Sequence, residues 1–246
     1  VFSEAVCADS SVCGSNVFSS AADITVPNLD NGTTSGTLST MTSDNNDNET
    51  WRGTFTPRTN TEDDNNTLSL ATSYTDLAGN NGPDNETENY EVDTRAPTVS
   101  SVAITSAEGR QTLGGYGFVN AGDNVSVTAT FSEAVIFDNA SITPTIILAV
   151  GSDNRTATYA SGDNSTELVF RYTIQATGTS GENDSNGISI PENALDNNSS
   201  TIRDRVGNNA ILTHSALSDN SSYKVDTTLP TVSSVAITDT DGDQNS

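Results

Sequence analysis

The sequence predicts an all-β protein, built from antiparallel β-sandwiches in tandem that are joined by short proline-containing linkers. Three observations lead to this prediction. A long segment of the chain recurs, apolar and polar residues alternate with a period of two, and the stretches between the alternating runs are rich in Asn, Asp, Gly and Ser. The first observation indicates tandem domains, and the other two indicate strands joined by turns.

Fourteen residues recur almost unchanged 133 positions later. They read VDTRAPTVSSVAIT at 92–105 and VDTTLPTVSSVAIT at 225–238, and they differ only at Arg95 against Thr228 and at Ala96 against Leu229. The shorter segment FSEAV occurs at 2–6 and again at 131–135. Because this period is longer than that of helical solenoids, it indicates whole domains in tandem.

Strands are predicted wherever apolar residues occupy every second position. Such runs lie at 51–55, 68–70, 125–131 and 168–174. This alternation is typical of strands with one buried face. No window shows the periodicity of an amphipathic helix, and the intervening segments have the composition of turns and loops. At least seven short strands between two linkers favour an antiparallel sandwich.

The repeats predict four segments along the chain. Residues 1–91 form a repeat that lacks its first strands, 92–97 a linker, 98–224 a complete repeat, and 225–246 a linker with the first strand, at 231–238, of a further repeat. Proline fixes its own backbone and restricts the residue before it, so the linkers should be short and semi-rigid. We expect a piece of a longer array; the alternative is a subunit whose open ends are completed by another chain.

Charge limits the partners of this chain. There are 33 acidic against 9 basic residues, a formal net charge of −24, and Lys224 is the one lysine. Such a chain repels phosphate backbones and anionic lipid surfaces, so nucleic acid is not an expected partner and cations are the natural counterions. No apolar stretch reaches the length of a membrane span, so no direct membrane insertion is expected, and any leader or anchor would lie outside the segment.

Four motifs resemble a known family. The segments VDTxxPTVSSVAI, NAGDNVSVTATFSEAV, YTDLAGNNG and WRGTFTP are similar to the immunoglobulin-like (Big-type) tandem repeats of giant bacterial and archaeal surface adhesins, biofilm proteins and S-layer proteins. The resemblance covers nearly the whole chain. It implies extracellular immunoglobulin-like sandwiches at the cell surface that serve as spacers or lattice elements, often with calcium at the junctions between domains.

The acidic stretch near the C-terminal end of the sequence is the first candidate calcium site. Calcium takes six to eight oxygen ligands from carboxylates, amides and carbonyls. Side-chain oxygens at every second position have the spacing of a calcium loop, and the residues that supply them are Asp239, Asp241, Asp243 and Asn245. The alternative is an acidic, solvated turn.

The second candidate lies where sandwich topology brings loops to one end of a repeat. Glu133 in the loop after the second strand, Asp204 and Asn208 in a later loop and Asp93 in the incoming linker should meet there. The equivalent residues in the neighbouring repeats are Glu4, Asp76, Asn80 and Asp226. Crowded carboxylates repel one another unless a cation lies among them. The alternative is that Asp76 and Asp204 cap their own tight turns.

The cysteines and the histidine predict structural roles. Cys7 and Cys13 lie in one Gly- and Ser-rich loop, and in an oxidising compartment such a pair most often forms a local disulfide. The one histidine, His214, lies in a stretch that alternates as a strand does, so we expect a residue on a strand surface rather than a ligand or a base.

Twelve Asn-x-Ser/Thr sequons are candidates for glycosylation of an extracellular chain. Their asparagines are Asn31, Asn48, Asn65, Asn85, Asn124, Asn139, Asn154, Asn164, Asn183, Asn197, Asn198 and Asn220. The alternative is that loops rich in Asn, Ser and Thr produce these sequons without selection for sugar.

An enzyme is not expected. The single histidine has no recognisable catalytic partners, zinc would need more His or Cys ligands, and the acidic residues lie in turns rather than in an aromatic-lined pocket. Two classes of function remain. One is a structural wall, filament, S-layer or stalk element whose partners are copies of itself or neighbouring repeats; the other is an adhesin module that itself binds a host, glycan or substrate surface.

Overall fold

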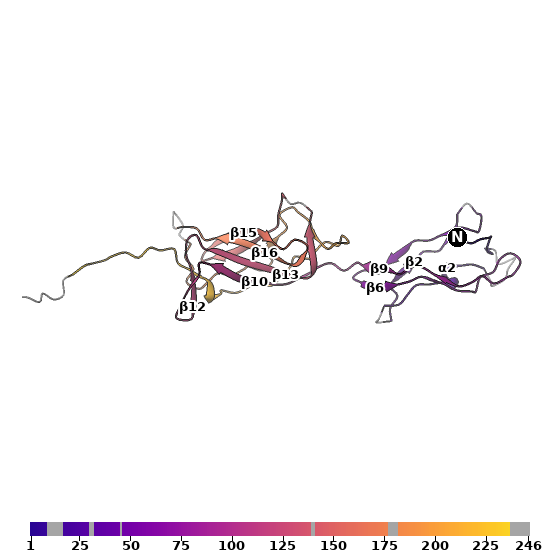
Figure 1. Cartoon of the computed structure of the whole chain (residues 1–246), viewed down its shortest axis with the longest axis horizontal. Coiled ribbons are helices and arrows are strands. Elements are labelled where there is room, and N and C mark those ends of the chain that lie inside the picture. The colour runs from indigo at the N-terminus through magenta and orange to yellow at the C-terminus, as the bar shows by residue number, and fades with distance from the viewer. Residues whose placement is uncertain (9–16, 30–31, 45, 139–140, 177–181, 237–246) are drawn as a thin grey trace, which may run out of the picture. The chain divides into compact units, whose positions relative to one another are not determined.

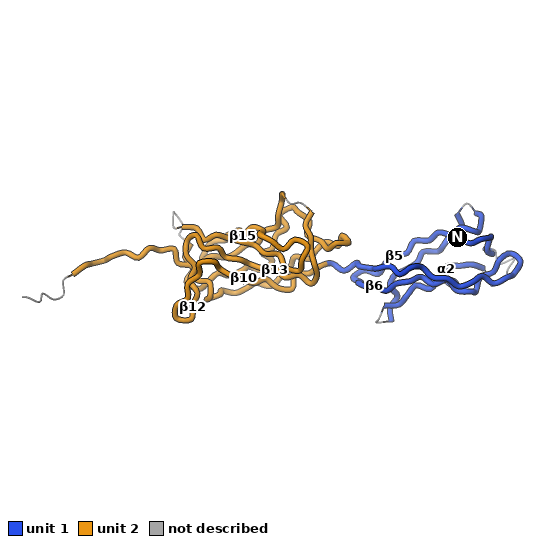
Figure 2. Tube along the Cα trace, in the orientation of Figure 1, with its two compact units in different colours: residues 1–96 blue, residues 97–246 orange. Residues whose placement is uncertain are grey.

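The computed structural model describes residues 1–8, 17–29, 32–44, 46–138, 141–176 and 182–236. It contains two compact units, unit 1 (Val1–Ala96) and unit 2 (Pro97–Ser246), which Figure 2 colours separately. The division falls inside the segment 92–97 that the sequence predicts as a linker. Both units consist almost entirely of strands and turns, which confirms the predicted all-β fold.

Unit 1 is a set of short strands in four small antiparallel sheets, preceded by the one-turn helix α2 (Ser20–Asp23). The first sheet joins β1 (Ile24–Thr25), β7 (Ser69–Leu70) and β8 (Asn85–Glu86). The other three sheets are pairs: β2 (Gly36–Leu38) with β5 (Phe55–Pro57), β3 (Thr42–Ser43) with β4 (Trp51–Arg52), and β6 (Glu62–Asn66) with β9 (Tyr90–Asp93).

The core of unit 1 is small and aromatic. Its buried residues are Val6, Phe18 and Tyr74, against which partly buried side chains such as Phe2 and Trp51 pack. Phe18 makes edge-to-face contacts with Trp51, at 4.9 Å between ring centroids, and with Tyr74, at 5.9 Å. Such geometry is preferred because the edge of one ring is positive and the face of the other is negative.

Unit 2 is organised around one seven-stranded sheet (Figure 1). Its order is β10 (Val99–Glu108), β13 (Asn124–Phe137), β16 (Ser165–Thr173), β15 (Asp153–Ser161), β14 (Thr145–Val150) and β17 (Leu195–Asp196), with β18 (Ile202–Arg203) pairing with the end of β13. A second sheet contains β11 (Gln111–Leu113), β12 (Tyr116–Val119) and β19 (Lys224–Val225), and the 3₁₀ turn η1 (Ser221–Tyr223) precedes β19.

The predicted alternation places the core of unit 2 correctly. In β13, Val125, Val127 and Ala129 are fully buried, and in β16 Leu168 and Phe170 are fully buried as well. Because successive side chains of a strand point to opposite faces, burial of one face requires apolar residues with a period of two. The same core cluster includes buried residues of the second sheet, so the two sheets pack face to face.

One pairing departs from the predicted antiparallel arrangement. Strand β12 pairs parallel to β19, with Phe118 opposite Lys224 and Val119 opposite Val225. Val119 and Val225 are both buried in the core of unit 2. The last strand before the second linker is therefore attached to the unit that precedes that linker.

The predicted strand at 231–238 is not formed in its described part, residues 231–236. Val232 and Val235 are 83% and 91% exposed, whereas the equivalent Val99 and Val102 lie in β10 and are partly buried or buried. The physical reason is that a strand needs a partner ladder. In unit 2, β10 obtains its ladder from β13, and no described residue pairs with 231–236.

Candidate functional site

Asp204 closes a tight turn with its own carboxylate. Its Oδ1 accepts hydrogen bonds from the backbone N–H groups of Val206 (2.9 Å), Gly207 (2.6 Å) and Asn208 (2.9 Å), and its Oδ2 accepts one from Asn208 Nδ2 (2.7 Å). Gly207 has a φ of 110°, which glycine adopts without strain. Asp204 is 2% exposed, so these donors compensate for the loss of water around the carboxylate.

Asp76 makes the same turn in unit 1. Oδ1 accepts from the backbone N–H groups of Ala78 and Asn80, both at 2.8 Å, and Oδ2 accepts from Asn80 Nδ2 at 2.7 Å. Hydrogen bonds hold the pKa of Asp76 below its ordinary value. The Asn80 side chain contributes most to this shift, and the backbone donors contribute less. In both units, therefore, the first and last residues of the Asp-x-x-Gly-Asn motif form a turn cap, as the alternative interpretation of the sequence proposed.

Glu133 lies within β13 rather than in a loop, so the predicted loop position is wrong. The ladder between β13 and β16 is interrupted between Thr130 and Val135, and this irregularity contains Glu133. One carboxylate oxygen of Glu133 lies within 4.8 Å of one of Asp204. The sequence missed the strand because Ser-Glu-Ala breaks the alternation that marks the rest of β13.

The start of unit 2 is attached beside this carboxylate pair. Ile211 donates its backbone N–H to the carbonyl of Pro97 at 2.8 Å, and Thr98 exchanges hydrogen bonds with Ser132, the residue before Glu133. The beginning of unit 2 and the residues around Glu133 and Asp204 therefore lie at the same end of this unit.

The two linker aspartates make the same local turn. Asp93 Oδ1 accepts the backbone N–H of Arg95 at 3.0 Å, and Asp226 Oδ1 accepts that of Thr228 at 3.0 Å. Asp93 ends β9 of unit 1, and Asp226 follows β19 of unit 2. Each aspartate thus fixes the direction in which its linker leaves the last strand.

The donor set in unit 2 fits a calcium ion only in part. Asp204 Oδ1 is saturated by three N–H donors, which leaves Oδ2 as the oxygen that would reach a cation. Together with the two oxygens of Glu133 this supplies at most three of the six to eight ligands that calcium takes. Further oxygens would have to come from the linker residue Asp93, from backbone carbonyls or from water.

Of the remaining predicted ligands, Glu4, Asp76 and Asn80 line the same cavity of unit 1. Glu4 is exposed, and among the residues that the structure describes, it belongs to no group of three ligating side chains. Asp239, Asp241, Asp243 and Asn245 lie outside the described residues.

Cys7 is fully buried and disulfide-bonded, while Cys13 lies outside the described residues, so their pairing stays a prediction. Burial in the core of unit 1 makes Cys7 a structural residue rather than a reactive thiol.

No sequon asparagine of the described residues is buried. Those described are Asn48, Asn65, Asn85, Asn124, Asn154, Asn164, Asn183, Asn197, Asn198 and Asn220, whereas Asn31 and Asn139 lie outside the described part of the chain. The side-chain oxygen of Asn183 accepts hydrogen bonds from the backbone N–H of Thr227 and from the hydroxyl of Thr228.

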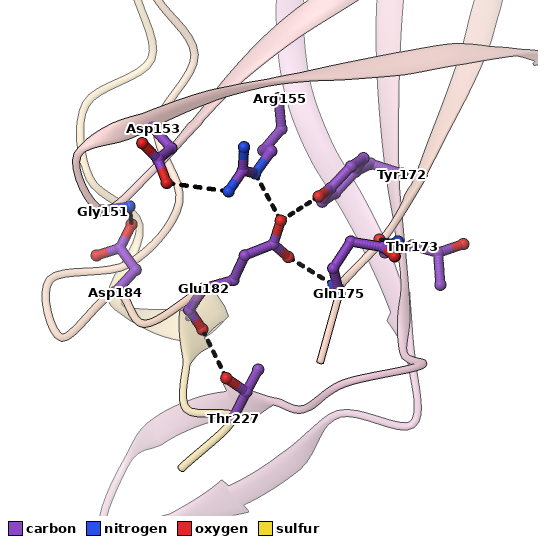
Figure 3. A network of polar contacts seen from close by, with 9 residues as sticks. All are labelled: Gly151, Asp153, Arg155, Tyr172, Thr173, Gln175, Glu182, Asp184 and Thr227. Carbon is purple, nitrogen blue, oxygen red and sulfur yellow. Dashed lines mark hydrogen bonds and ion pairs between the residues drawn. The ribbon is translucent and has the colours of Figure 1, made fainter. Parts of the chain in front are cut away.

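Sequence reasoning missed a buried polar network centred on Glu182, which is 2% exposed (Figure 3). Its Oε1 accepts from Arg155 Nε at 2.5 Å and from the Tyr172 hydroxyl, and its Oε2 accepts from the backbone N–H of Gln175 at 2.6 Å. Arg155 also pairs with Asp153 at 2.9 Å. Burial, and then the carboxylate of Glu182, raises the pKa of Tyr172 far above its ordinary value.

A second buried carboxylate, Asp184, ties two turns together. Its Oδ1 accepts from the backbone N–H groups of Asn186 (3.0 Å) and Gly187 (2.8 Å), and its Oδ2 accepts from Gly151 N–H at 2.8 Å. The backbone of Asp184 also exchanges two hydrogen bonds with Val225 of β19. The loop that carries Glu182 and Asp184 is thereby fixed to the last strand of unit 2.

One sequence signal pointed to this network. In β15, Arg155 occupies the same face as the fully buried Ala157, because alternate residues of a strand share a face. An arginine on a buried face requires an acidic partner. The partner was not identifiable, since Glu182 lies in a loop rich in Asn, Asp, Gly and Ser like many other acidic residues of the chain.

His214 is buried and hydrogen-bonded, and the prediction of a strand-surface position is wrong. Its Nε2 accepts the backbone N–H of Leu195 at 3.2 Å, so Nδ1 carries the proton and donates to the carbonyl of Ser215 at 2.9 Å. The sequence misled because these two backbone partners come from an irregular segment and a two-residue strand, neither of which leaves a periodic pattern.

Unit 1 has a cavity of about 430 Å³ with aromatic, acidic and amide side chains among its lining residues. The aromatic side chains are Phe2, Phe18, Trp51 and Tyr74. In unit 2 the residue equivalent to Phe2, Phe131, is 3% exposed, because β10 lies beside it. No sequence pattern indicates this cavity, since its aromatic residues are distant from one another in the chain.

The comparisons agree with this architecture. Residues 17–92, all of them in unit 1, match the family model of a bacterial Ig-like domain, which confirms the predicted resemblance. Domains of this type are non-catalytic structural modules, usual in surface or extracellular proteins. No curated protein and no solved structure matches the chain. No helix in the described part of the chain has the length and apolar composition that crossing a membrane requires.

Proposed function

We propose that this chain is an extracellular structural repeat segment of a cell-surface protein, such as an S-layer, a surface filament or an adhesin stalk. The observation that carries the proposal is the repeated linker. The same VDT sequence stands at the end of the last strand of both all-β units, and its aspartate makes the same turn in both. A module repeated with its connector is what a spacer requires, because length is added without new contacts having to evolve.

The partners of such a segment are neighbouring repeats or further copies of the chain, and surface glycans attached to the exposed sequons. The net charge of −24 supports an extracellular position among cations rather than a nucleic acid partner. The surface location is tested by immunogold labelling of intact cells with antibodies against unit 2. Labelling of unbroken cells supports the proposal, and labelling only after lysis contradicts it.

Calcium is the proposed stiffening ion. Within unit 2, Glu133 and the Oδ2 atom of Asp204 would hold the ion. Asp93, four residues before Pro97 in the sequence, is proposed as a further ligand. A four-residue segment spans at most about 14 Å, so Asp93 cannot lie far from the anchored Pro97. An ion bound by this set would neutralise carboxylates that otherwise repel one another. The equivalent site of unit 1 would use Glu4, Asp76 and Asn80.

Chelation tests the calcium site. Because an ion that binds only the native state stabilises it by mass action, removal of calcium should lower the melting temperature of unit 2. Glu133→Gln should abolish this calcium-dependent shift. The matched variant Glu167→Gln changes an exposed glutamate of the same unit and should retain it. Equal melting curves with calcium and with chelator would remove calcium from the proposal and leave the spacer role to the labelling experiment.

The aromatic cavity of unit 1 favours a second candidate, an adhesin module that binds its target directly. Aromatic side chains around a cavity of this size are able to stack on sugars or to receive apolar groups. Trp51 is the single tryptophan of the chain and lines the cavity, so its fluorescence reports on occupancy. Saturable quenching by cell-surface glycans would support this candidate, and unchanged emission across a glycan panel would contradict it.

A further inference from the structure

We infer that the threonine of each VDT segment latches the outgoing linker onto the preceding unit, so that in the first linker backbone freedom is confined to Ala96, the residue before the proline. The inference does not depend on a bound cation. It combines the contacts of Thr94 in unit 1, those of Thr227 in unit 2, and the positions at which the two linkers differ in sequence.

In unit 1 the latch consists of three hydrogen bonds made by Thr94. Its backbone N–H donates to the carbonyl of Thr61 at 2.7 Å, and its hydroxyl oxygen accepts the N–H of Thr61 at 3.0 Å. The same hydroxyl donates to the carbonyl of Arg58 at 2.6 Å. Thr94 therefore continues the pairing of β6 with β9 by one residue beyond the end of β9, and its hydroxyl group supplies the acceptor for the Thr61 N–H.

In unit 2 the equivalent Thr227 is 5% exposed and is held by different partners. Its N–H donates to Asn183 Oδ1 at 3.0 Å, and its hydroxyl donates to the carbonyl of Glu182 at 3.3 Å (Figure 3). The Glu182 side chain is fixed in turn by Arg155 and Tyr172. The buried network thus supports the backbone onto which the second linker is latched.

The next linker residue differs between the repeats and is matched to its own unit. Arg95 forms an ion pair with Glu62 of unit 1, whereas the hydroxyl of Thr228 donates to Asn183 Oδ1 of unit 2 at 3.3 Å. The Arg95 pair is largely exposed, so it adds little stability. The two side chains therefore reinforce the latch, which the threonines and the aspartate turns provide in both units.

On the far side of the first linker, the chain is fixed again at Pro97. Ile211 N–H donates to the Pro97 carbonyl at 2.8 Å, and Ser132 Oγ accepts the Thr98 N–H at 3.0 Å. Proline has a fixed φ and confines the residue before it to extended backbone conformations. Ala96 occupies the second position at which the two linkers differ. Among the described residues from Asp93 to Thr98, it alone makes no hydrogen bond. The hinge is therefore a single residue with restricted freedom.

Amide ¹⁵N relaxation of the whole chain tests the latch. In the wild-type protein, the heteronuclear NOE should fall at Ala96 and remain at the level of structured residues at Thr94 and Thr98. Thr94→Val keeps the shape of the side chain but removes the hydroxyl, so the decrease should spread to Thr94 and Asp93. Thr94→Ser keeps the hydroxyl and should retain the wild-type profile. A profile in which Thr94→Val matches Thr94→Ser, or in which wild-type Asp93 is already mobile, would overturn the inference.

A second variant separates the latch from general loss of structure. Thr227→Val should increase hydrogen exchange at the Thr227 and Thr228 amides, while the amides of the buried strand residues Val127 and Phe170 keep their wild-type exchange. Equal exchange at Thr227 in wild type and variant would contradict the latch. Both experiments are run once with calcium and once with chelator. If the effect of the variants is the same under the two conditions, it tests the latch independently of the cation site.

Discussion

At the scale of single residues, the aspartates of the Asp-x-x-Gly-Asn motifs explain how a strongly acidic chain folds. Asp76 and Asp204 each direct both carboxylate oxygens at N–H groups of their own turn. A carboxylate with several N–H donors is stable without a cationic partner. Local N–H donors therefore stabilise carboxylates that the nine basic residues of the chain are too few to pair with.

The turn of unit 1 should give its stability an acid limit. Since hydrogen bonds from Asn80 and the backbone lower the folded pKa of Asp76, the stabilisation is complete above the pKa of the unfolded carboxyl, about 3.9. It is lost as the pH falls through the lower folded value. NMR titration of the Asp76 carboxyl should show this low pKa, and Asn80→Ala should raise it. A midpoint at the ordinary value in both proteins would contradict the prediction.

The Tyr172 hydroxyl should contribute about 1.5–3 kcal/mol to the free energy of unfolding, the usual range for a hydrogen bond to a charged group. Tyr172→Phe removes a donor from the buried Glu182 carboxylate. Because the folded pKa of Tyr172 is raised, this contribution is present below the pKa of an unfolded tyrosine, about 10, and is lost only at higher pH. Denaturant unfolding at pH 7 measures the difference. Tyr116→Phe, at a position that is 47% exposed, is the control and should be close to neutral.

At the scale of elements, the stability of unit 2 depends on the apolar face of its large sheet. Phe170 of β16 is fully buried, and its ring lies 6.4 Å from that of Tyr159 on β15. Phe170→Ala should therefore cost about 3–5 kcal/mol, the usual result of a large core truncation. The β11–β12 hairpin gives the control, because Leu113 is 75% exposed and Leu113→Ala should change stability by less than about 0.5 kcal/mol. Comparable losses in the two variants would disprove this assignment of the core.

Long strands were predictable from the sequence and short ones were not. The runs in β13 and β16 alternate over seven residues, so burial of one face leaves a clear pattern. Most strands of unit 1 are two or three residues long, too short for a period of two to appear. The parallel pairing of β12 with β19 joins segments more than 100 residues apart, and no local pattern encodes such a contact.

The candidate site was predictable only where a turn encodes it. The Asp-x-x-Gly-Asn motif marks Asp76 and Asp204, because an aspartate followed by a glycine of positive φ is a local signal. Glu133 was placed near Asp204 correctly but in the wrong element. The Glu182 network depends on tertiary burial. The fold decides which of the 33 acidic residues are removed from water, and the composition of the sequence does not show which ones these are.

At the scale of the whole molecule, the two units have cores of very different size. Among the described residues, five buried apolar residues belong to unit 1 and 21 belong to unit 2. Heating should therefore give two transitions, with unit 1 unfolding first, because stability rises with the apolar area buried. Trp51 fluorescence should follow only the first transition, since this tryptophan lies in unit 1. One transition seen at the same temperature by calorimetry and by Trp51 would contradict the prediction.

The order of strands in unit 2 has a mechanical consequence. The linker runs directly into β10, and after β19 the chain leaves the unit at the end opposite to the one where it enters (Figure 2). Tension on the polypeptide therefore pulls β10 lengthwise along β13, to which it is paired from Val99 to Glu108. Because ladder hydrogen bonds lie across the strands, the load is shared by the whole ladder in shear. Such a ladder ruptures as a unit rather than opening bond by bond, which suits a tether that bears force.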